Sequence, residues 1–243
     1  MVTPEYELPT WLDVAPVEGR SHDFAVHSQS LGEDVHCRVW SPDDSSGPLP
    51  LLVAHDGPEY ARLSQLTRFS AVKIAAGELP PHRVALLAPR ERDEWYSASP
   101  RYTRMLMQDV LPKLPPTHGA PAAIGASLGA LALVYAQRRH PGTFGALFLQ
   151  SGSFFMPRYD AHESRFPHYH RVVGFVRETL RAAEPATVPT VLTCGAAEEN
   201  IHNNRVMAET LQAPLHELTD THNYTAWRDA FDPHLARLLA AAW

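Results

Sequence analysis

Short apolar runs alternate with longer helix-like segments from residue 50 onward. The apolar runs end near Gly, Pro or Asp, and they predict strands within residues 49–57, 83–90, 120–125, 145–152, 190–195 and 215–219. The segments between them predict helices over residues 60–77, 101–114, 128–140, 170–183, 203–211 and 224–242. Alternation of strands and helices at this spacing is typical of a parallel sheet that helices cover on both faces.

The first 48 residues follow a different pattern. Residues 22–28 and 33–40 alternate apolar and polar side chains on either side of a Leu-Gly turn, which predicts an antiparallel hairpin. One face of this hairpin would carry the side chains of Phe24, Val26, Val35, Cys37 and Val39.

The combined pattern predicts an α/β fold in a single domain over residues 1–243. We expect a three-layer sandwich with a mostly parallel central sheet, to which residues 1–48 add an antiparallel N-terminal hairpin edge. Residues 153–169 are rich in polar and aromatic side chains and have no regular period. We interpret this segment as a candidate lid insertion.

Composition and charge mainly exclude several classes of protein. The 243-residue chain has a formal net charge of −6, so it lacks the basic character that a nucleic-acid-binding protein needs. It has no run of about 18 apolar residues to span a membrane, and residues 1–16 lack the basic and apolar regions of a secretory signal. Its two cysteines, Cys37 and Cys194, make no disulfide framework. These observations favour a cytoplasmic protein with two free, buried thiols; a secreted protein whose leader has been removed would have the same pattern.

The clearest chemical motif is the stretch Gly125–Gly129, whose sequence Gly-Ala-Ser-Leu-Gly fits the pattern G-x-S-x-G. It follows a predicted strand and precedes a predicted helix, which is the context that a nucleophile elbow requires. The two glycines would let strand and helix approach closely around a strained turn at Ser127. The start of the helix would present free N–H groups beside the serine. The motif therefore predicts a nucleophilic serine rather than a simple turn of small residues.

A serine hydroxyl needs a general base, and the base needs an acid that orients it. In hydrolases with this elbow the chain order is serine, then acid, then histidine. The predicted strand 190–195 is followed by Glu198 and Glu199, and the loop after the last predicted strand contains His222. His222 is therefore the candidate base, with His202 as its main competitor, and both glutamates fit the position of the acid.

Acyl transfer from an ester also requires two N–H donors for the negatively charged oxygen of the intermediate. The backbone N–H of Leu128 is one candidate, and the stretch 55–60 after the first strand of the parallel sheet offers the other. Four side chains are candidates for substrate contact, with core packing or a solvated loop as the alternative: Asp56, Tyr60, Trp95 and Phe154.

Four stretches of the chain resemble the putative-esterase family of α/β-hydrolases, which contains enterochelin esterase, esterase D and the mycolyltransferases. They are residues 55–60, 125–155, 194–211 and 222–231, and the likeness is greatest to enterochelin-esterase-type proteins. The resemblance implies Ser127 as nucleophile and His222 as base. The Gly-x-x-Asp/Glu pattern of the family implies Glu198, rather than Glu199, as the acid.

The chain departs from the family pattern at two points. Pro58 stands where the second oxyanion donor of the family often falls, and proline has no N–H, so Gly57 or Glu59 would have to serve instead. We take Leu128 and Gly57 as the expected pair. The residues before the parallel sheet are also too few for the N-terminal β-domain of full-length enterochelin esterases.

We therefore expect a serine carboxylester hydrolase that forms an acyl-enzyme. Its partner would be a small-molecule ester, either of small to medium size or of the siderophore type. The alternatives are an acyltransferase that uses the same acyl-enzyme, as mycolyltransferases do, and a non-catalytic binding module. No cofactor is expected, and no metal, because the histidines at 168 and 170 lack a full set of ligands. The acyl group, the alcohol and the oligomeric state are not specified by these patterns.

Overall fold

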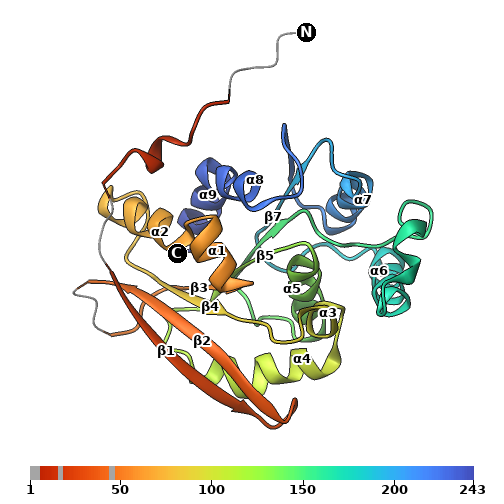
Figure 1. Ribbon diagram of the computed structural model, residues 1–243, viewed down its shortest axis with the longest axis horizontal. Helices are drawn as coiled ribbons and strands as arrows, with labels where there is room; N and C mark the ends of the chain where they lie inside the picture. Colours follow the sequence, from red (N-terminus) through yellow and green to blue (C-terminus); the bar gives the residue numbers. More distant parts are fainter. Residues whose placement is uncertain (1–5, 16–18, 44–46) are drawn as a thin grey trace.

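The computed structural model describes residues 6–15, 19–43 and 47–243. Residues 1–5, 16–18 and 44–46, which belong to the predicted N-terminal edge, lie outside the described residues. Within the described ranges, one sheet has the strand order β1-β2-β4-β3-β5-β6-β7-β8 (Figure 1). The strands are β1 (Gly19–Ser28), β2 (Glu33–Pro42), β3 (Leu51–His55), β4 (Arg83–Leu87), β5 (Ala122–Ala126), β6 (Ala146–Gln150), β7 (Thr190–Gly195) and β8 (Leu215–Leu218).

Strand pairing confirms the predicted sheet. Pairing is antiparallel between β1 and β2 and between β2 and β4. It is parallel from β4 through β3, β5, β6 and β7 to β8. Each predicted strand is present, because short apolar runs bounded by turn residues are typical of strands that a sheet buries on both faces.

Helices cover both faces of the sheet and complete the three layers that we expected. Residues of β3 alternate between two hydrophobic clusters: Val53 joins the cluster under α3 to α7, and Leu52 joins the cluster under α1, α2, α8 and α9. The helices are α1 (Gly57–Leu63), α2 (Leu66–Ala75), α3 (Arg92–Tyr96), α4 (Pro100–Met105), α5 (Leu128–Arg139), α6 (Tyr169–Ala182), α7 (Ile201–Leu211), α8 (Tyr224–Asp229) and α9 (Ala236–Ala242).

The N-terminal hairpin packs by the face predicted for it. Phe24 lies opposite Cys37, and Val26 lies opposite Val35, in the antiparallel register of β1 and β2. Val26, Val35 and Cys37 are buried in the cluster under α3 to α7, and Phe24 packs against that cluster from its rim.

Two segments that were each predicted to form one continuous helix are each divided into separate helices, so the predicted helix lengths were wrong. In the segment 60–77, Gln65 adopts a left-handed conformation with φ of 54°, which separates α1 from α2. In the segment 224–242, Asp232 is extended (φ −111°, ψ 120°) between α8 and α9. The cause there is Pro233, because a proline disfavours the helical conformation of the residue before it.

The candidate lid consists of a buried start and an exposed remainder. Phe154 has no exposed surface, whereas residues 157–168 are mainly exposed. Asp160 anchors the exposed part: it is 2% exposed, and it accepts hydrogen bonds from the side chain of Asn203 on α7 and from the N–H of Met156. The role of this segment as a lid stays a prediction.

The described helices and the two cysteines bear on the expectations about membrane spans and free thiols. Within residues 6–15, 19–43 and 47–243, each helix is too short or too polar to cross a bilayer. Cys37 and Cys194 are free and buried, as predicted. Burial raises the pKa of Cys37 to about 12 and raises that of Cys194 further above its ordinary value.

Replacement of Gly57 by alanine is expected to destabilise the fold. A Cβ at this position would lie 2.3 Å from the Cα of Leu86 in β4, so α1 would have to move away from the sheet. We expect the free energy of unfolding to fall by about 1–3 kcal/mol in urea titrations. The matched control is Gly174→Ala: Gly174 is exposed in the middle of α6 with no atom within 4 Å of its Cβ position. There we expect a gain of about 0.5–1 kcal/mol. Equal stability of Gly57→Ala and the parent protein would contradict the prediction.

Candidate active site

The residues singled out from the sequence meet at one edge of the sheet. Ser127 follows β5, Glu198 follows β7 and His222 follows β8. These strands run parallel, so their carboxyl ends lie at the same edge, where binding sites of open α/β sheets are found (Figure 1). The loop 151–153, at the end of β6, lies between the serine on one side and the glutamate on the other.

Ser127 occupies a strained turn between β5 and α5. Its φ of 55° and ψ of −123° are rare for a residue other than glycine. Gly125 permits the turn, because a Cβ there would lie 2.7 Å from the carbonyl group of Gly129. This backbone geometry is that of the expected elbow, with the hydroxyl raised above the start of a helix.

The carboxylate of Glu198 contacts the imidazole of His222. The distance from Glu198 Oε2 to His222 Nδ1 is 2.7 Å. The side chain of Glu198 is 2% exposed and that of His222 is 43% exposed, so the acid is buried while the base reaches solvent. Burial acts to raise the pKa of Glu198, but hydrogen bonds from His222, Ser151 and the N–H of Gly195 leave it below its ordinary value. An ionised carboxylate in this position orients the imidazole and stabilises its protonated form.

The two alternatives left open by the sequence lie elsewhere. The side chain of Glu199 is 85% exposed, and its Oε2 lies 3.2 Å from His162 Nε2. The ring of His202 stacks on Tyr159, with ring centroids 5.3 Å apart. The structure therefore pairs Glu198 with His222, while Glu199 lies on the surface beside His162 and His202 lies on the surface against Tyr159.

Ser151 and Trp227 support the acid and the base, and the sequence analysis missed both. Ser151 Oγ donates to Glu198 Oε1 at 2.7 Å and accepts from Trp227 Nε1 at 3.0 Å. The ring of Trp227 also packs edge-to-face on His222, with centroids 5.1 Å apart. One tryptophan thus contacts the base directly and the acid through Ser151.

The hydroxyl of Ser127 is hydrogen-bonded to Ser153 rather than to His222. The two Oγ atoms lie 2.9 Å apart, and the N–H of Ser153 donates to the carbonyl of Ser127 at 3.1 Å. No hydrogen bond joins Ser127 to His222 in the described part of the chain. In this structure the hydroxyl of Ser127 is therefore held by Ser153.

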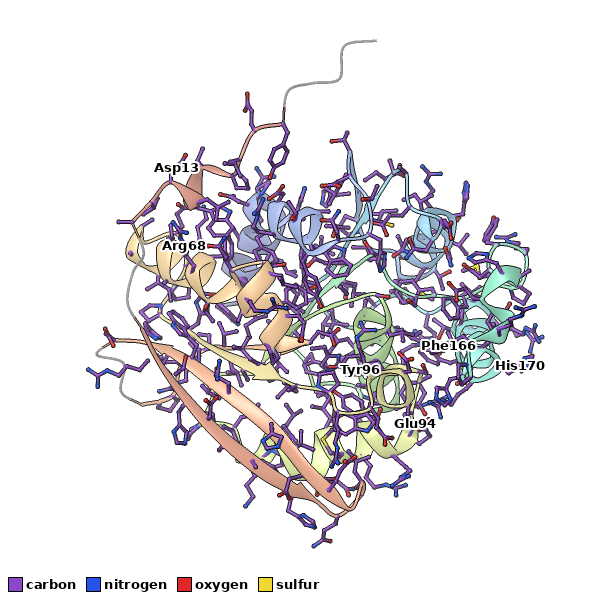
Figure 2. All side chains as sticks on the ribbon, viewed as in Figure 1. Asp13, Arg68, Glu94, Tyr96, Phe166 and His170 are labelled. Atoms are coloured by element: carbon purple, nitrogen blue, oxygen red, sulfur yellow. The ribbon has the colours of Figure 1, made fainter. Side chains whose placement is uncertain are left out.

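An ion pair between Asp56 and Arg92 lies beside the elbow, on the side of β5 where β3 lies. Asp56 follows β3 in a left-handed conformation with φ of 51°, and its two carboxylate oxygens accept hydrogen bonds of 2.9 and 2.8 Å from Arg92 of α3. Arg92 Nη2 also lies 3.5 Å from the carbonyl of Ala126, and the N–H of Asp56 donates to the hydroxyl of Tyr96 at 3.1 Å. Burial raises the pKa of Asp56, against the lowering by Arg92. Figure 2 labels Tyr96 and Glu94 on α3, which lies beside α5.

The two expected oxyanion donors are both the first residues of helices. Leu128 begins α5 and Gly57 begins α1. The first N–H of a helix has no acceptor within the helix, and within residues 6–15, 19–43 and 47–243 neither of these two groups has another partner.

Three of the four residues suggested for substrate contact are core side chains. Tyr60 and Phe154 have no exposed surface and Trp95 is 2% exposed. The hydroxyl of Tyr60 is bonded to Gln150, and Trp95 stacks on Tyr102. For these three, packing is the role that the structure shows, and the fourth, Asp56, is engaged with Arg92.

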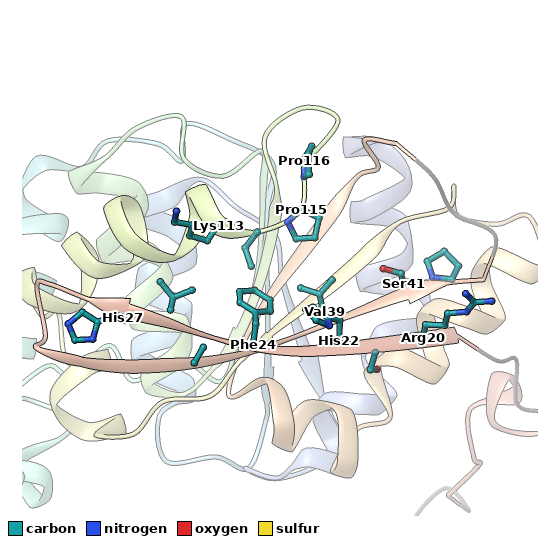
Figure 3. A pocket seen from close by; sticks show the side chains of 14 residues that line it. Arg20, His22, Phe24, His27, Val39, Ser41, Lys113, Pro115 and Pro116 are labelled. Carbon is teal, nitrogen blue, oxygen red and sulfur yellow. The ribbon is translucent and has the colours of Figure 1, made fainter.

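Other potential binding features lie away from this edge or do not form. A groove of about 1160 Å³ runs between β1 and the segment 113–116, with Phe24, Val39 and Pro115 among its walls (Figure 3). None of the candidate active-site residues lines it. Within the described ranges there is no group of three or more His, Cys, Asp or Glu side chains that could hold a metal ion.

A family model described as "Putative esterase" matches residues 28–238 of the sequence. The chain belongs to this esterase family. The match extends from the end of β1 into α9 and covers every residue of the candidate site, so the family resemblance inferred from four short stretches is confirmed along most of the chain.

Solved structures with the same fold include two esterases and one further hydrolase. The enterobactin esterase of Shigella flexneri superposes with a TM-score of 0.80 at 20% identity, covering 100% of this chain and 64% of that one. A ferulic acid esterase gives 0.75 at 16% identity, covering 94% and 99%. The S-formylglutathione hydrolase of Staphylococcus aureus gives 0.63 at 13% identity, covering 94% and 98%. No curated protein sequence matches the chain significantly. The α/β-hydrolase fold is thus established, and the chain spans about two thirds of the enterobactin esterase.

A buried histidine behind the elbow makes stability depend on pH. His55 has no exposed surface, and its ring nitrogens contact Tyr102 Oη and the carbonyl of Gly129. Burial lowers its pKa from 6.5 to about 4. The unfolded chain therefore binds more protons than the folded one between these values, and stability contributed by neutral His55 is lost as pH falls from about 6.5 to 4.

We expect the free energy of unfolding to decrease by up to about 3 kcal/mol from this residue over that pH range. Urea titrations of the parent protein and of His55→Gln between pH 7.5 and 4.5 check it, because the variant lacks the proton uptake. An identical pH slope in both proteins would contradict the prediction.

Proposed function

We propose that the protein is a serine carboxylester hydrolase in which Ser127, His222 and Glu198 form the catalytic triad. The single observation that carries the proposal is the 2.7 Å contact between buried Glu198 and His222 at the sheet edge that also bears the strained elbow of Ser127. Membership in the esterase family supports ester hydrolysis as the reaction.

In the proposed mechanism, Ser127 Oγ turns away from Ser153 toward His222 Nε2 when an ester binds. The serine attacks the carbonyl carbon and gives its proton to the imidazole, while Glu198 stabilises the imidazolium that forms. The N–H groups of Leu128 and Gly57 hold the oxyanion. Collapse of the intermediate transfers the proton from His222 to the leaving alcohol and leaves an acyl-enzyme. Water, deprotonated by His222, then releases the acid and restores Ser127.

The substrate class we propose is a carboxylic ester of small to medium size or of the siderophore type. Support comes from the fold shared with an enterobactin esterase and a ferulic acid esterase. Hydrolysis is the fate that we propose for the acyl-enzyme, because the side chain of His222 is 43% exposed and water can reach it. A panel of p-nitrophenyl esters of increasing chain length, run beside a ferric trilactone siderophore with and without glycerol as acceptor, distinguishes these substrates and both fates of the acyl group.

Removal of the proposed nucleophile is expected to abolish turnover. Ser127→Ala should lower kcat on p-nitrophenyl acetate by about 10³-fold or more, because the acyl-enzyme can no longer form. Ser70→Ala is the matched control, since Ser70 is a buried serine of α2 whose hydroxyl has no partner in the described chain. Labelling by a fluorophosphonate probe should follow the same pattern. Retention of the parental rate in Ser127→Ala would exclude the proposal, and failure of the parent to label would favour a binding module.

The two adjacent glutamates provide an internal comparison for the acid. Glu198→Gln is expected to reduce kcat by about 10²-fold or more, because a neutral amide neither stabilises the imidazolium nor maintains the tautomer. Glu199→Gln should stay within about twofold of the parent, since an exposed carboxylate is well screened. Steady-state kinetics of both variants check this, and a larger loss in Glu199→Gln than in Glu198→Gln would reverse the assignment.

A further inference from the structure

A second hydroxyl, that of Ser153, lies beside the proposed nucleophile, and the mechanism proposed above gives it no part. Ser153 Oγ is 2.9 Å from Ser127 Oγ, and Ser153 is 6% exposed. Among the residues that the structure describes, no other group is hydrogen-bonded to this hydroxyl. A buried hydroxyl whose one protein partner is the nucleophile is placed to act on the nucleophile itself.

The backbone that carries Ser153 is held in place on two sides. The carbonyl of Gly152 accepts a hydrogen bond from Asn204 Nδ2, and the N–H of Gly152 donates to Asn204 Oδ1, both at 2.9 Å. Asn204 lies on α7 and has no exposed surface. On the other side, the N–H of Ser153 donates to the carbonyl of Ser127 at 3.1 Å. The Ser153 hydroxyl therefore approaches the elbow from a fixed backbone.

The other serine of this loop is already engaged. Ser151 Oγ donates to Glu198 at 2.7 Å and accepts from Trp227 at 3.0 Å, so its hydrogen is used by the proposed acid. Of the two hydroxyls in the loop 151–153, only that of Ser153 is hydrogen-bonded to Ser127. The loop thus places one hydroxyl against the acid and the other against the nucleophile.

Acylation and deacylation make opposite demands on the contact between Ser127 and Ser153. In acylation, Ser127 Oγ leaves Ser153 and moves to the ester. In deacylation, the same oxygen is the leaving group, gains negative charge as its bond to the acyl carbon breaks, and moves back toward Ser153. It carries no hydrogen until His222 returns the proton, so it can only accept hydrogen bonds. A hydroxyl donor at that place stabilises the oxygen as it leaves.

We propose that Ser153 is a catalytic residue of deacylation, whose hydroxyl donates a hydrogen bond to Ser127 Oγ as that oxygen leaves the acyl carbon. The inference rests on the proposed function, because it assumes an acyl-enzyme on Ser127. Before this step, water has given a proton to His222 and its oxygen has added to the acyl carbon. The bond from that carbon to Ser127 Oγ then breaks, His222 transfers its proton to Oγ, and the carboxylic acid is released. The proton of Ser153 stays on its own oxygen throughout.

A simple latch is the competing interpretation. The same 2.9 Å contact would then only hold the Ser127 hydroxyl away from His222 before the ester binds. Removal of a latch accelerates acylation and leaves deacylation unchanged, whereas removal of the proposed donor slows deacylation. The two interpretations therefore separate when the two rate constants are measured independently.

The test compares S153A and S153T with the parent protein, and S70A, which alters a buried serine of α2, is the control. Stopped-flow kinetics with p-nitrophenyl acetate give the acylation constant from the burst of p-nitrophenol and the deacylation constant from the steady state. We expect the deacylation constant of S153A to fall by about tenfold, with the acylation constant within about threefold of the parent. Its kcat and KM should therefore fall together, and mass spectrometry after acid quenching should show more acyl-enzyme. S70A should leave both constants unchanged.

Threonine keeps the hydroxyl, so S153T should deacylate within about threefold of the parental rate. A deacylation constant of S153A within about threefold of the parent would overturn the inference. So would equal losses in acylation and deacylation, which a merely structural role would produce, or a rise in the acylation constant alone, which is the result for a latch. S153T no faster in deacylation than S153A would also overturn it.

Thermal unfolding of each variant establishes that it folds, and S153C carries the test if S153A does not. A thiol is a weaker donor, so the deacylation constant of S153C should fall by at least about threefold, and a parental value would overturn the inference. Ser127→Ala, measured alongside, separates this inference from the proposed function. If it is inactive while S153A deacylates at the parental rate, only this inference fails; if it keeps the parental activity, the proposed function fails as well.

Discussion

The site depends on one steric constraint, the backbone contact between β5 and the first turn of α5. A Cβ on Gly125 would lie 2.7 Å from the carbonyl group of Gly129, so the glycine at 125 lets the chain reverse sharply at Ser127. The same closeness lets the end of β3 pack on the helix, with His55 Nδ1 3.1 Å from the carbonyl of Gly129. The proposed nucleophile, the start of α5 and the turn after β3 therefore lie around one close backbone contact. A larger residue at Gly125 would force β5 and α5 apart.

On the side of the elbow where β6 and β7 lie, hydrogen bonds that stabilise the fold also orient Glu198, the proposed acid. A buried carboxylate is tolerated only when donors satisfy it. Glu198 has three, from Ser151, the N–H of Gly195 and His222. Two of these donors belong to strand ends of the central sheet. Gly195 ends β7 and Ser151 directly follows β6, so the pairing of these two strands places two of the three donors to the proposed acid.

The strands and the order of the proposed triad could be predicted from the sequence because each is marked by residues that are close together in the chain. Apolar runs mark the strands, and Ser127, Glu198 and His222 each stand just after a strand. The breaks at Gln65 and Asp232 were missed, since the apolar period continues through both. Ser151, Ser153 and Arg92 gain their partners only through long-range contacts. Serine is common, and nothing near 151–153 in the sequence indicates that one hydroxyl faces the acid and another the nucleophile.

The two buried thiols give the molecule a pair of native reporters. Cys37 lies in the hairpin at one margin of the sheet, and Cys194 lies in β7 beneath the acid. With their pKa values raised by burial, both are almost fully protonated at neutral pH and closed to alkylating reagents. Each sulfur can react only when its own part of the sheet opens. The rates of alkylation of Cys37 and Cys194 therefore report, without any introduced label, how independently the hairpin and the strand beside the proposed active site open.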